Sequence, residues 1–392
     1  MIIIAGKNEI ALHGLSLIQK IVDKNEIGVI VNKNDDGVDR WQPSLLKAAR
    51  KLGVNVYTLE EVYGKKIDLF LSLEFDQIVD PEKLSTDKIF NFHFSILPKY
   101  KGMYTSVWPV LNGDKSSGVS LHLIDRGIDT GAIIRQEIFD LNENDRSQDC
   151  YRKYLKNSKK LLSDEIENII SGSYQTVDQS WLGASYYPKN SINFFDLKLN
   201  LNQTAWQVQR QLYAFSFRPY QLLEFKGERI VELTVSESKS TKRPGHIYHE
   251  TSDNYLISTV DFDITLHKDR LNRLLESIPT ASIEQFKLGL LNIAGVNDRN
   301  EFGWSPIIVA AYHGRLDLID YLLGQGADIN DTNYRGTSVL MYAKDFSIKA
   351  SCKEYFRQII ELGADPELLD YSGRRVFDYL TADQKKFLSF DD

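Results

Sequence analysis

Residues 91–102 read Asn-Phe-His-Phe-Ser-Ile-Leu-Pro-Lys-Tyr-Lys-Gly, and they place an amide and an imidazole where a buried strand ends. Asn91 and His93 are two residues apart, so in an extended chain their side chains point to the same side, while Phe92 and Phe94 face the other. The proline and glycine that follow break the strand and form a loop. Because loops at the end of a rigid sheet often carry catalytic residues, we expect a functional site here.

The segment before this site alternates strands and helices. Apolar runs predict strands at residues 2–5, 27–31, 54–58 and 68–73, and helical periodicity predicts helices between the first two strands and at residues 45–52. This succession predicts a parallel sheet with right-handed crossovers, and hence an α/β domain. The turn at residues 6–8 reads Gly-Lys-Asn and lacks the Gly-x-Gly-x-x-Gly fingerprint, so it does not indicate a dinucleotide.

A second motif, Gly-Ile-Asp-Thr-Gly, occupies residues 127–131 and follows His122. Together the two motifs resemble the folate-dependent formyltransferases, and the resemblance covers roughly the first 180 residues. It implies transfer of a formyl group from N10-formyltetrahydrofolate to an amine. By the same resemblance, the catalytic residues are Asn91, His93 and Asp129, and the donor is bound by Ser72, Leu73, Phe75, Gly127 and Asp129.

Formyl transfer needs residues of these types. Attack of an amine on the formyl carbon builds negative charge on the formyl oxygen, which an N–H of Asn91 or a protonated imidazole can stabilise. The attacking amine must also lose a proton, and histidine is the side chain whose ordinary pKa is nearest neutrality. Asp129 would hold the imidazole of His93 in one tautomer and favour its charged form, or share the proton relay with an ordered water.

Each of these residues also has a structural interpretation. A single histidine at a strand end is usually a hydrogen-bonded structural residue, and Asp129 in its glycine-rich pentapeptide fits a turn. The functional interpretation is favoured because both motifs occur in family order behind a strand-rich segment. His122 lies on a strand whose residues Val119, Leu121 and Leu123 are apolar, so it faces away from them, and we interpret it as a residue that supports the trio.

The composition of the chain changes after Gly172. Residues 186–194 resemble the connection that carries the acceptor in the nucleotide-sugar members of the family, and a helix and several short strands with polar turns follow as far as residue 266. Aromatic and cationic groups in this region suit a base and a diphosphate. The candidate acceptor-binding residues are Tyr100, Tyr187, Lys189, Asn193, Arg218 and Tyr220, although each alone could be an ordinary surface residue.

The end of the chain contains an internal repeat. The segment that starts at Gly303 recurs from Gly336, and Asn297 recurs as Asn330, which gives the 33-residue period of ankyrin repeats. Ankyrin stacks usually bind proteins, so a partner protein or self-association is the first interpretation, and packing against the catalytic half is a second. A third is an auxiliary nucleotide-sugar site built from Trp304, Tyr312, His313, Tyr334 and Arg335.

Composition restricts the remaining classes. The 392 residues carry a net charge of −7, which argues against a general nucleic-acid surface. A basic run at residues 152–160 has helical periodicity and fits the solvated face of an amphipathic helix. No apolar run is long enough for a membrane helix, and no signal peptide is recognisable at the first residues. Cys150 and Cys352 have no paired spacing, so neither disulfides nor a metal site is expected, and a reducing cytoplasm is the natural location.

We therefore expect three domains: a Rossmann-like α/β formyltransferase domain at residues 1–183, a small β-rich domain for substrate binding and dimerisation at 184–266, and an all-α ankyrin domain at 267–392. The resemblance is strongest to enzymes that formylate dTDP-3-amino-3,6-dideoxyhexoses for O-antigen or other surface glycans, with a homodimer as the expected assembly. The alternatives are an enzyme acting on methionyl-tRNA, which would need a basic RNA-binding surface, a glycinamide-ribonucleotide enzyme, which would end after the catalytic domain, and a non-catalytic ankyrin adaptor.

Overall fold

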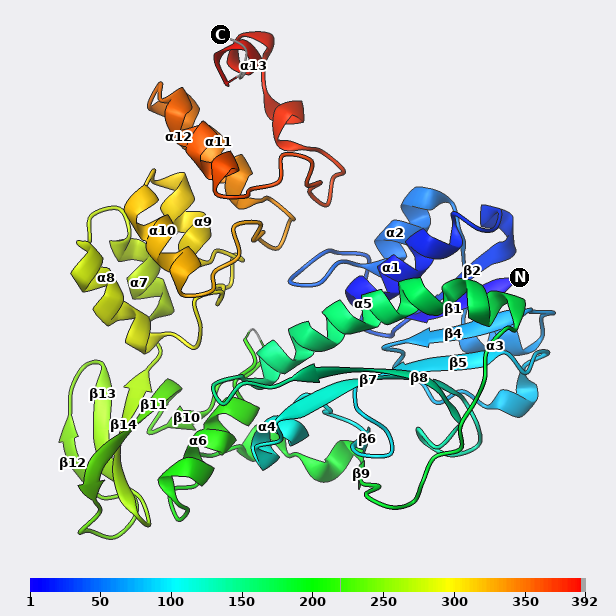
Figure 1. The fold of residues 1–392 in the computed structure, drawn as a ribbon, viewed down its shortest axis with the longest axis horizontal. Helices are drawn as coiled ribbons and strands as arrows, with labels where there is room; N and C mark the ends of the chain where they lie inside the picture. Colours follow the sequence, from blue (N-terminus) through cyan, green and yellow to red (C-terminus); the bar gives the residue numbers. More distant parts are fainter. Residues whose placement is uncertain (219, 389–392) are drawn as a thin grey trace. The chain divides into compact units, whose positions relative to one another are not determined.

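The computed structural model describes residues 1–218 and 220–388, which form two compact units (Figure 1). Unit 1 consists of Met1–Leu197 together with Tyr213–Phe215, and unit 2 consists of the other described residues from Lys198 onward. This division is coarser than the three expected domains, whose boundaries remain predictions. Residues 389–392 of the expected third domain lie outside the described residues.

Unit 1 is built on a seven-stranded sheet with the order β3-β2-β1-β4-β5-β7-β8. The strands from β1 to β5 pair in parallel, whereas β7 and β8 join as antiparallel neighbours. The predicted Rossmann-like architecture is confirmed, but the alternating pattern did not predict the antiparallel pair. The strands are β1 (Ile2–Gly6), β2 (Ile27–Val31), β3 (Asn55–Val56), β4 (Leu69–Leu73), β5 (Ile89–His93), β7 (Ser116–Leu123) and β8 (Ile133–Asp140).

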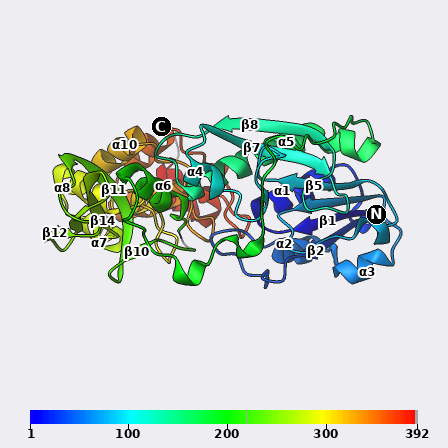
Figure 2. The same ribbon diagram turned by 90° about the horizontal axis from the view of Figure 1, so that it is seen from below.

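Helices cover both faces of this sheet. On one face α1 (Asn8–Ile18) contacts β1 and the long helix α5 (Ser147–Ser171), which lies along β7 and β8 (Figure 2). On the other face Val62 of α3 (Leu59–Tyr63) packs with Ile3 and Ala5 of β1. Local signals set the ends of these helices: Ser44 caps α2 (Leu45–Leu52), which ends at Gly53 with a φ of 69°.

Short elements complete the secondary structure of the described residues. In unit 1, β6 (Lys101–Gly102) pairs in parallel with β9 (Tyr186–Tyr187), and α4 (Trp108–Asn112) precedes β7. The 3-10 helices are η1 (Lys24–Glu26), η2 (Pro81–Lys83), η3 (Lys189–Ser191), η4 (Phe194–Asp196), η5 (Leu290–Asn292) and η6 (Val376–Tyr379). Among residues 1–218 and 220–388, no helix is both long and apolar enough to cross a membrane.

The basic run of α5 is largely matched by acidic partners within unit 1. Lys159 Nζ lies 2.6 Å from Glu9 Oε2, and Arg152 pairs with Asp149 at 3.7 Å. Lys153 and Lys160 form ion pairs with Asp145 and Glu137, respectively. The opposite side of α5 buries Tyr154, Leu161 and Leu162, as expected for an amphipathic helix.

Unit 2 contains a five-stranded antiparallel sheet in the order β10-β11-β14-β13-β12, which confirms the predicted β-rich region. Its strands are β10 (Glu224–Phe225), β11 (Glu228–Lys239), β12 (Ile247–Glu250), β13 (Asn254–Ser258) and β14 (Phe262–Lys268). Helix α6 (Ala205–Ala214) precedes the sheet in the sequence.

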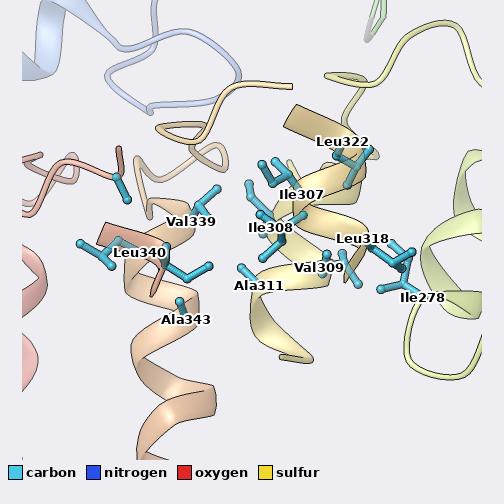
Figure 3. Packing of buried hydrophobic residues seen from close by; sticks show 14 of the residues in the cluster. Ile278, Ile307, Ile308, Val309, Ala311, Leu318, Leu322, Val339, Leu340 and Ala343 are labelled. Carbon is cyan, nitrogen blue, oxygen red and sulfur yellow. The ribbon is translucent and has the colours of Figure 1, made fainter. Parts of the chain in front are cut away.

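Three pairs of helices and a last helix follow the sheet in the described part of unit 2, as the 33-residue period predicted. They are α7 (Leu271–Ser277), α8 (Ile283–Gly289), α9 (Pro306–Tyr312), α10 (Leu316–Gly324), α11 (Val339–Lys349), α12 (Lys353–Glu361) and α13 (Ala382–Leu388). Figure 3 shows Ile308 of α9 between Leu318 of α10 and Leu340 of α11, within one continuous apolar core. Stacking of neighbouring repeats is what buries this core.

The repeats contact each other through equivalent residues. Asn297 donates from Nδ2 to the carbonyl oxygen of Gly326 at 3.0 Å, and Asn330 donates to that of Gly363 at 3.2 Å. Gly303 has a φ of 84°, and a Cβ there would lie only 2.5 Å from the backbone nitrogen of Tyr334. This close approach requires glycine at the repeat turn.

Candidate active site

The candidate site lies at the carboxyl end of β5, between β4 and β7. Asn91 is in register with Ser72 on one side and with His122 on the other. Residues in register share a face of the sheet, so their side chains meet. Asn91 Nδ2 lies 3.1 Å from His122 Nε2 as a result.

Asp129 completes the trio from the loop that follows β7. Its Oδ1 lies 3.4 Å from both His93 Nδ1 and Asn91 Nδ2, and its Oδ2 accepts a 2.8 Å hydrogen bond from the backbone N–H of Gly102. The backbone of Asp129 is left-handed, with a φ of 55°. The structure therefore brings Asn91, His93 and Asp129 together around one carboxylate, in a place that sequence spacing alone could only suggest.

Both ring nitrogens of His93 face oxygen atoms. Nε2 lies 2.8 Å from the carbonyl oxygen of Tyr100, which can only accept, so Nε2 carries a hydrogen. Nδ1 faces the carboxylate of Asp129, and it can donate there only when the ring is doubly protonated. His93 therefore lies between the backbone carbonyl of Tyr100 and the side-chain carboxylate of Asp129.

His122 is held in its neutral state. Its Nδ1 lies 2.7 Å from the carbonyl oxygen of Leu123 and donates to it, which leaves Nε2 to accept from Asn91 Nδ2. The pKa of His122 is lowered to about 4, and burial is the largest cause. The effect of the neighbouring His93, which lowers this pKa, is larger than that of Asp129, which raises it. The neutral ring thus orients the Asn91 amide with its N–H groups toward His122 and Asp129.

The residues expected to bind the donor lie at the carboxyl ends of β4 and β7. Ser72 is buried beside Asn91, and the carbonyl oxygen of Leu73 accepts from the backbone N–H of Lys7 at 3.2 Å. Phe75 packs edge-on against Phe70, with ring centroids 6.4 Å apart. The backbone N–H of Gly127 donates to Asp125 Oδ1 at 3.0 Å, which shapes the Asp129 loop.

Four expected acceptor-binding residues belong to unit 1. The Tyr100 hydroxyl donates to Asp114 Oδ2 at 2.6 Å, and burial raises the pKa of this phenol. Tyr187 stacks on Trp108 with ring centroids 3.9 Å apart. Lys189 accepts at its carbonyl oxygen from the Tyr104 hydroxyl, and Asn193 Oδ1 accepts from a backbone N–H two residues later. Their roles toward an acceptor remain predictions.

The other two expected acceptor-binding residues belong to unit 2. Arg218 forms ion pairs with Asp269 at 2.9 Å and with Asp298 at 3.2 Å, so its guanidinium joins the β-rich segment to the first ankyrin loops. Tyr220 is exposed beside Phe217. These two carboxylates already compensate the charge of Arg218, so an acceptor diphosphate would have to compete with them for its guanidinium.

The five residues expected at an auxiliary ankyrin site occupy two different places. Trp304 precedes α9, and its neighbour Gly303 contacts Tyr334, which is followed by Arg335 on the next repeat turn. Tyr312 ends α9 and His313 follows it, about 10 Å away along a seven-residue helix. The structure groups Trp304, Tyr334 and Arg335 on successive turns and leaves the other two at the opposite end of α9.

The structure also shows a polar cluster around Glu74, beside β4. Donor-binding residues are expected on either side of Glu74, but the sequence does not predict this cluster. Glu74 accepts from the Tyr151 hydroxyl at 2.9 Å and from Asn8 Nδ2 at 3.3 Å, and desolvation raises the pKa of Glu74 to about 7. It lies where the sheet order reverses between β1 and β4, the usual ligand crevice of such sheets. No group of His, Cys, Asp and Glu in the described parts of the chain is arranged to hold a metal ion.

Comparison with known proteins agrees with this geometry. The formyl transferase family model matches residues 59–166, and the model for three ankyrin repeats matches residues 280–370. Among curated proteins, the methionyl-tRNA formyltransferase of Staphylococcus aureus strain MW2 is 24% identical over 271 residues, which cover 65% of this chain and 86% of that protein.

Two solved structures are more similar. WlaRD, a sugar 3N-formyl transferase crystallised with dTDP and 5-N-formyl-THF, is 40% identical with a TM-score of 0.62, covering 68% of this chain and 97% of that one. The N-formyltransferase from Helicobacter canadensis, in complex with folinic acid and dTDP-3-aminofucose, is 42% identical with a TM-score of 0.63, covering 68% and 98%. The chain therefore belongs to the sugar N-formyltransferases and carries ankyrin repeats in addition.

Proposed function

We propose that this enzyme transfers a formyl group from N10-formyltetrahydrofolate to the amine of a dTDP-linked 3-amino-3,6-dideoxyhexose, for O-antigen or other surface glycans. The observation that carries the proposal is the convergence of Asn91 and His93 on the Asp129 carboxylate. The acceptor class is supported by the similarity to WlaRD and to the Helicobacter canadensis enzyme along nearly their full lengths.

The hydrogen-bond donors of the site suit the oxygen of a formyl group. N10-formyltetrahydrofolate supplies the formyl group and, after transfer, leaves as tetrahydrofolate. Asn91 Nδ2 has an N–H that points at Asp129 over a long 3.4 Å contact, so this N–H can turn to an oxygen on which negative charge develops. His93 Nδ1, which faces Asp129 at a distance of 3.4 Å, is the second group placed to donate to the same oxygen.

Asp129 is suited to receive the proton that the attacking amine must lose. Its carboxylate lies 3.4 Å from His93 Nδ1, so the two groups are placed to act together on that proton. The hydrogen bond from Gly102 to Oδ2 fixes the carboxylate while Oδ1 faces the other two residues. Asp129 and His93 thus act as one acid–base pair rather than as independent groups.

An assay of full-length protein tests the proposal. Release of tetrahydrofolate would be followed by absorbance with N10-formyltetrahydrofolate and a panel of dTDP-3-amino and dTDP-4-amino sugars of both gluco and galacto configuration. Methionyl-tRNA and glycinamide ribonucleotide would form separate arms, because the S. aureus relative is a methionyl-tRNA enzyme. We expect turnover of a 3-amino sugar, lowered about 100-fold or more in Asp129→Asn. Turnover of methionyl-tRNA alone would overturn the acceptor, and no turnover in any arm would favour the non-catalytic adaptor.

We further propose a cytoplasmic homodimer that binds neither nucleic acid nor membrane. Cys150 is buried and Cys352 is partly buried, and both are free thiols, which suits a reducing compartment. Light scattering after size exclusion would test the dimer, since a monomer at micromolar concentration would contradict it. For the ankyrin repeats we retain two proposals, a partner protein or an auxiliary nucleotide-sugar site around Trp304.

A further inference from the structure

A segment of unit 1, residues 177–187, hydrogen-bonds to both loops that carry the site, and we name it the strap. It begins at Val177, which pairs with Ile133 at the start of β8 through two 2.8 Å backbone hydrogen bonds. It ends in β9, which pairs with β6. The strap lies outside residues 59–166, the part that matches the formyl transferase family model.

Gln179 of the strap holds the Asp129 loop. Its Nε2 donates to the carbonyl oxygens of Asp129 at 2.9 Å and Gly131 at 2.8 Å. A flipped amide would turn Oε1 toward two acceptors, so these carbonyls determine the orientation of the side chain. Oε1 has no hydrogen-bond partner within the described residues, so the donor side of the amide alone ties the strap to the loop.

Ser185 of the strap holds the other loop. Its Oγ accepts a hydrogen bond from the backbone N–H of Tyr100 at 2.8 Å. Its carbonyl oxygen accepts one from the backbone N–H of Lys101 at 2.9 Å. Tyr100 in turn presents the carbonyl oxygen that accepts from His93 Nε2. The strap therefore hydrogen-bonds directly to Asp129 and to Tyr100, the two residues that face the ring nitrogens of His93.

The two residues that flank His93 share a backbone feature. Asp129 has a φ of 55° and Tyr100 a φ of 59°, so both occupy the left-handed region that residues with a Cβ seldom adopt. Such conformations persist only where surrounding contacts hold them. Gln179 bonds to the backbone of one of these residues and Ser185 to the backbone of the other, which is where restraint is needed.

We propose that the strap is the positioning element of the active site and that Gln179 and Ser185 are positioning residues that set the two partners of His93. This inference rests on the proposed function for its kinetic readout. Neither residue needs to touch substrate. Each acts through a backbone amide or carbonyl that orients Asp129 or Tyr100, and through them the imidazole. A tether that merely stabilises the fold would make a different prediction, because it would leave kcat intact in any variant that remains folded.

Steady-state kinetics with paired variants distinguish the two roles. Gln179→Met keeps the length of the side chain without its donor, and Ser185→Ala removes the hydroxyl. We expect kcat to fall about 100-fold and about 10-fold respectively, with the KM of the acceptor and the affinity for folinic acid unchanged, because small misplacements of catalytic groups act on kcat. Ser185→Thr restores the hydroxyl and should recover most of the loss. The matched controls are Gln175→Met and Ser173→Ala, which change exposed residues just before the strap.

A change of less than threefold in kcat for both folded variants, or a loss confined to KM, overturns the proposal. A second readout needs no acceptor: the imidazole ¹⁵N signals of His93, assigned with His93→Asn, report its tautomer and protonation. They should shift in Gln179→Met and Ser185→Ala but not in the two controls, and unchanged signals would also overturn the proposal. Shifted signals in a protein that turns over no acceptor would instead separate a failure of the proposed function from a failure of this inference.

Discussion

Replacing His122 by glutamine should remove a pH dependence from the stability of unit 1. In the native state the His122 ring is neutral, because Nε2 accepts from Asn91 and burial lowers its pKa to about 4 from the ordinary value of 6.5. The unfolded state therefore binds one more proton than the native state between these two values. Stability that depends on this group is complete above pH 6.5 and falls as the pH is lowered toward 4.

The size of the effect follows from the two pKa values. They differ by 6.5 − 4, or 2.5, and each tenfold change in a protonation equilibrium is worth 1.36 kcal/mol, so the wild type should lose about 3 kcal/mol from this histidine alone. Glutamine can still accept from Asn91 but does not titrate. The variant should be less stable at neutral pH because its packing is poorer, yet its stability should decline less steeply toward acid.

Urea unfolding at 25 °C in steps from pH 7.5 to pH 4 provides the measurement. Hydrogen exchange of backbone amides in β5 and β7, followed by mass spectrometry, would report unit 1 separately from unit 2. His249→Gln changes an exposed histidine of unit 2 and serves as the control. If the stability difference between wild type and His122→Gln stays constant within about 0.5 kcal/mol over this range, the neutral, buried assignment of His122 is wrong.

Three further predictions concern activity and binding. His93→Asn and Asp129→Asn should each lower kcat about 100-fold or more with the fold intact by circular dichroism, and activity within about fivefold of wild type would remove that residue from the mechanism. Asn91→Ala should cost roughly 3 kcal/mol of transition-state stabilisation in kcat/KM measurements, whereas a change in KM alone would make Asn91 a binding residue. Trp304→Ala should weaken an ankyrin nucleotide-sugar site by about 1–3 kcal/mol in equilibrium titration with a dTDP-sugar, and a single class of site in both proteins would leave the repeats to partner binding or packing.

Much of the fold could be predicted because local signals coincide with packing. The helix at residues 45–52 and the strand at 27–31 have the predicted bounds, since a cap residue, a glycine and a buried apolar run mark their ends. The ankyrin repeats were recognisable because stacking repeats a contact every 33 residues, as the Asn297 and Asn330 bonds show. The antiparallel entry of β7 and β8 was not predicted, because an alternating strand does not specify the direction of its neighbour.

The site could be predicted only in part. Period-two alternation placed Asn91 and His93 on one side of β5 and turned His122 away from its apolar neighbours, and the structure agrees. Nothing in the sequence indicated that Gln179, fifty residues after Asp129, bonds to its backbone. A lone glutamine in an irregular segment has no periodicity, and a left-handed φ at a residue with a Cβ leaves no compositional signal.

The acidic partners of the basic run on α5 reduce the affinity of this face for polyanions such as RNA. Lys159 and Lys160 already neutralise Glu9 and Glu137 within unit 1, so a phosphate backbone would have to displace a protein carboxylate to engage either lysine. Each phosphate neutralised by a free lysine releases condensed counterions. This steepens the fall of the logarithm of the affinity with the logarithm of the salt concentration by about 0.9. A helix whose lysines are paired internally gains little of this entropy. Any residual association of this face with RNA should therefore be weak and nearly independent of ionic strength.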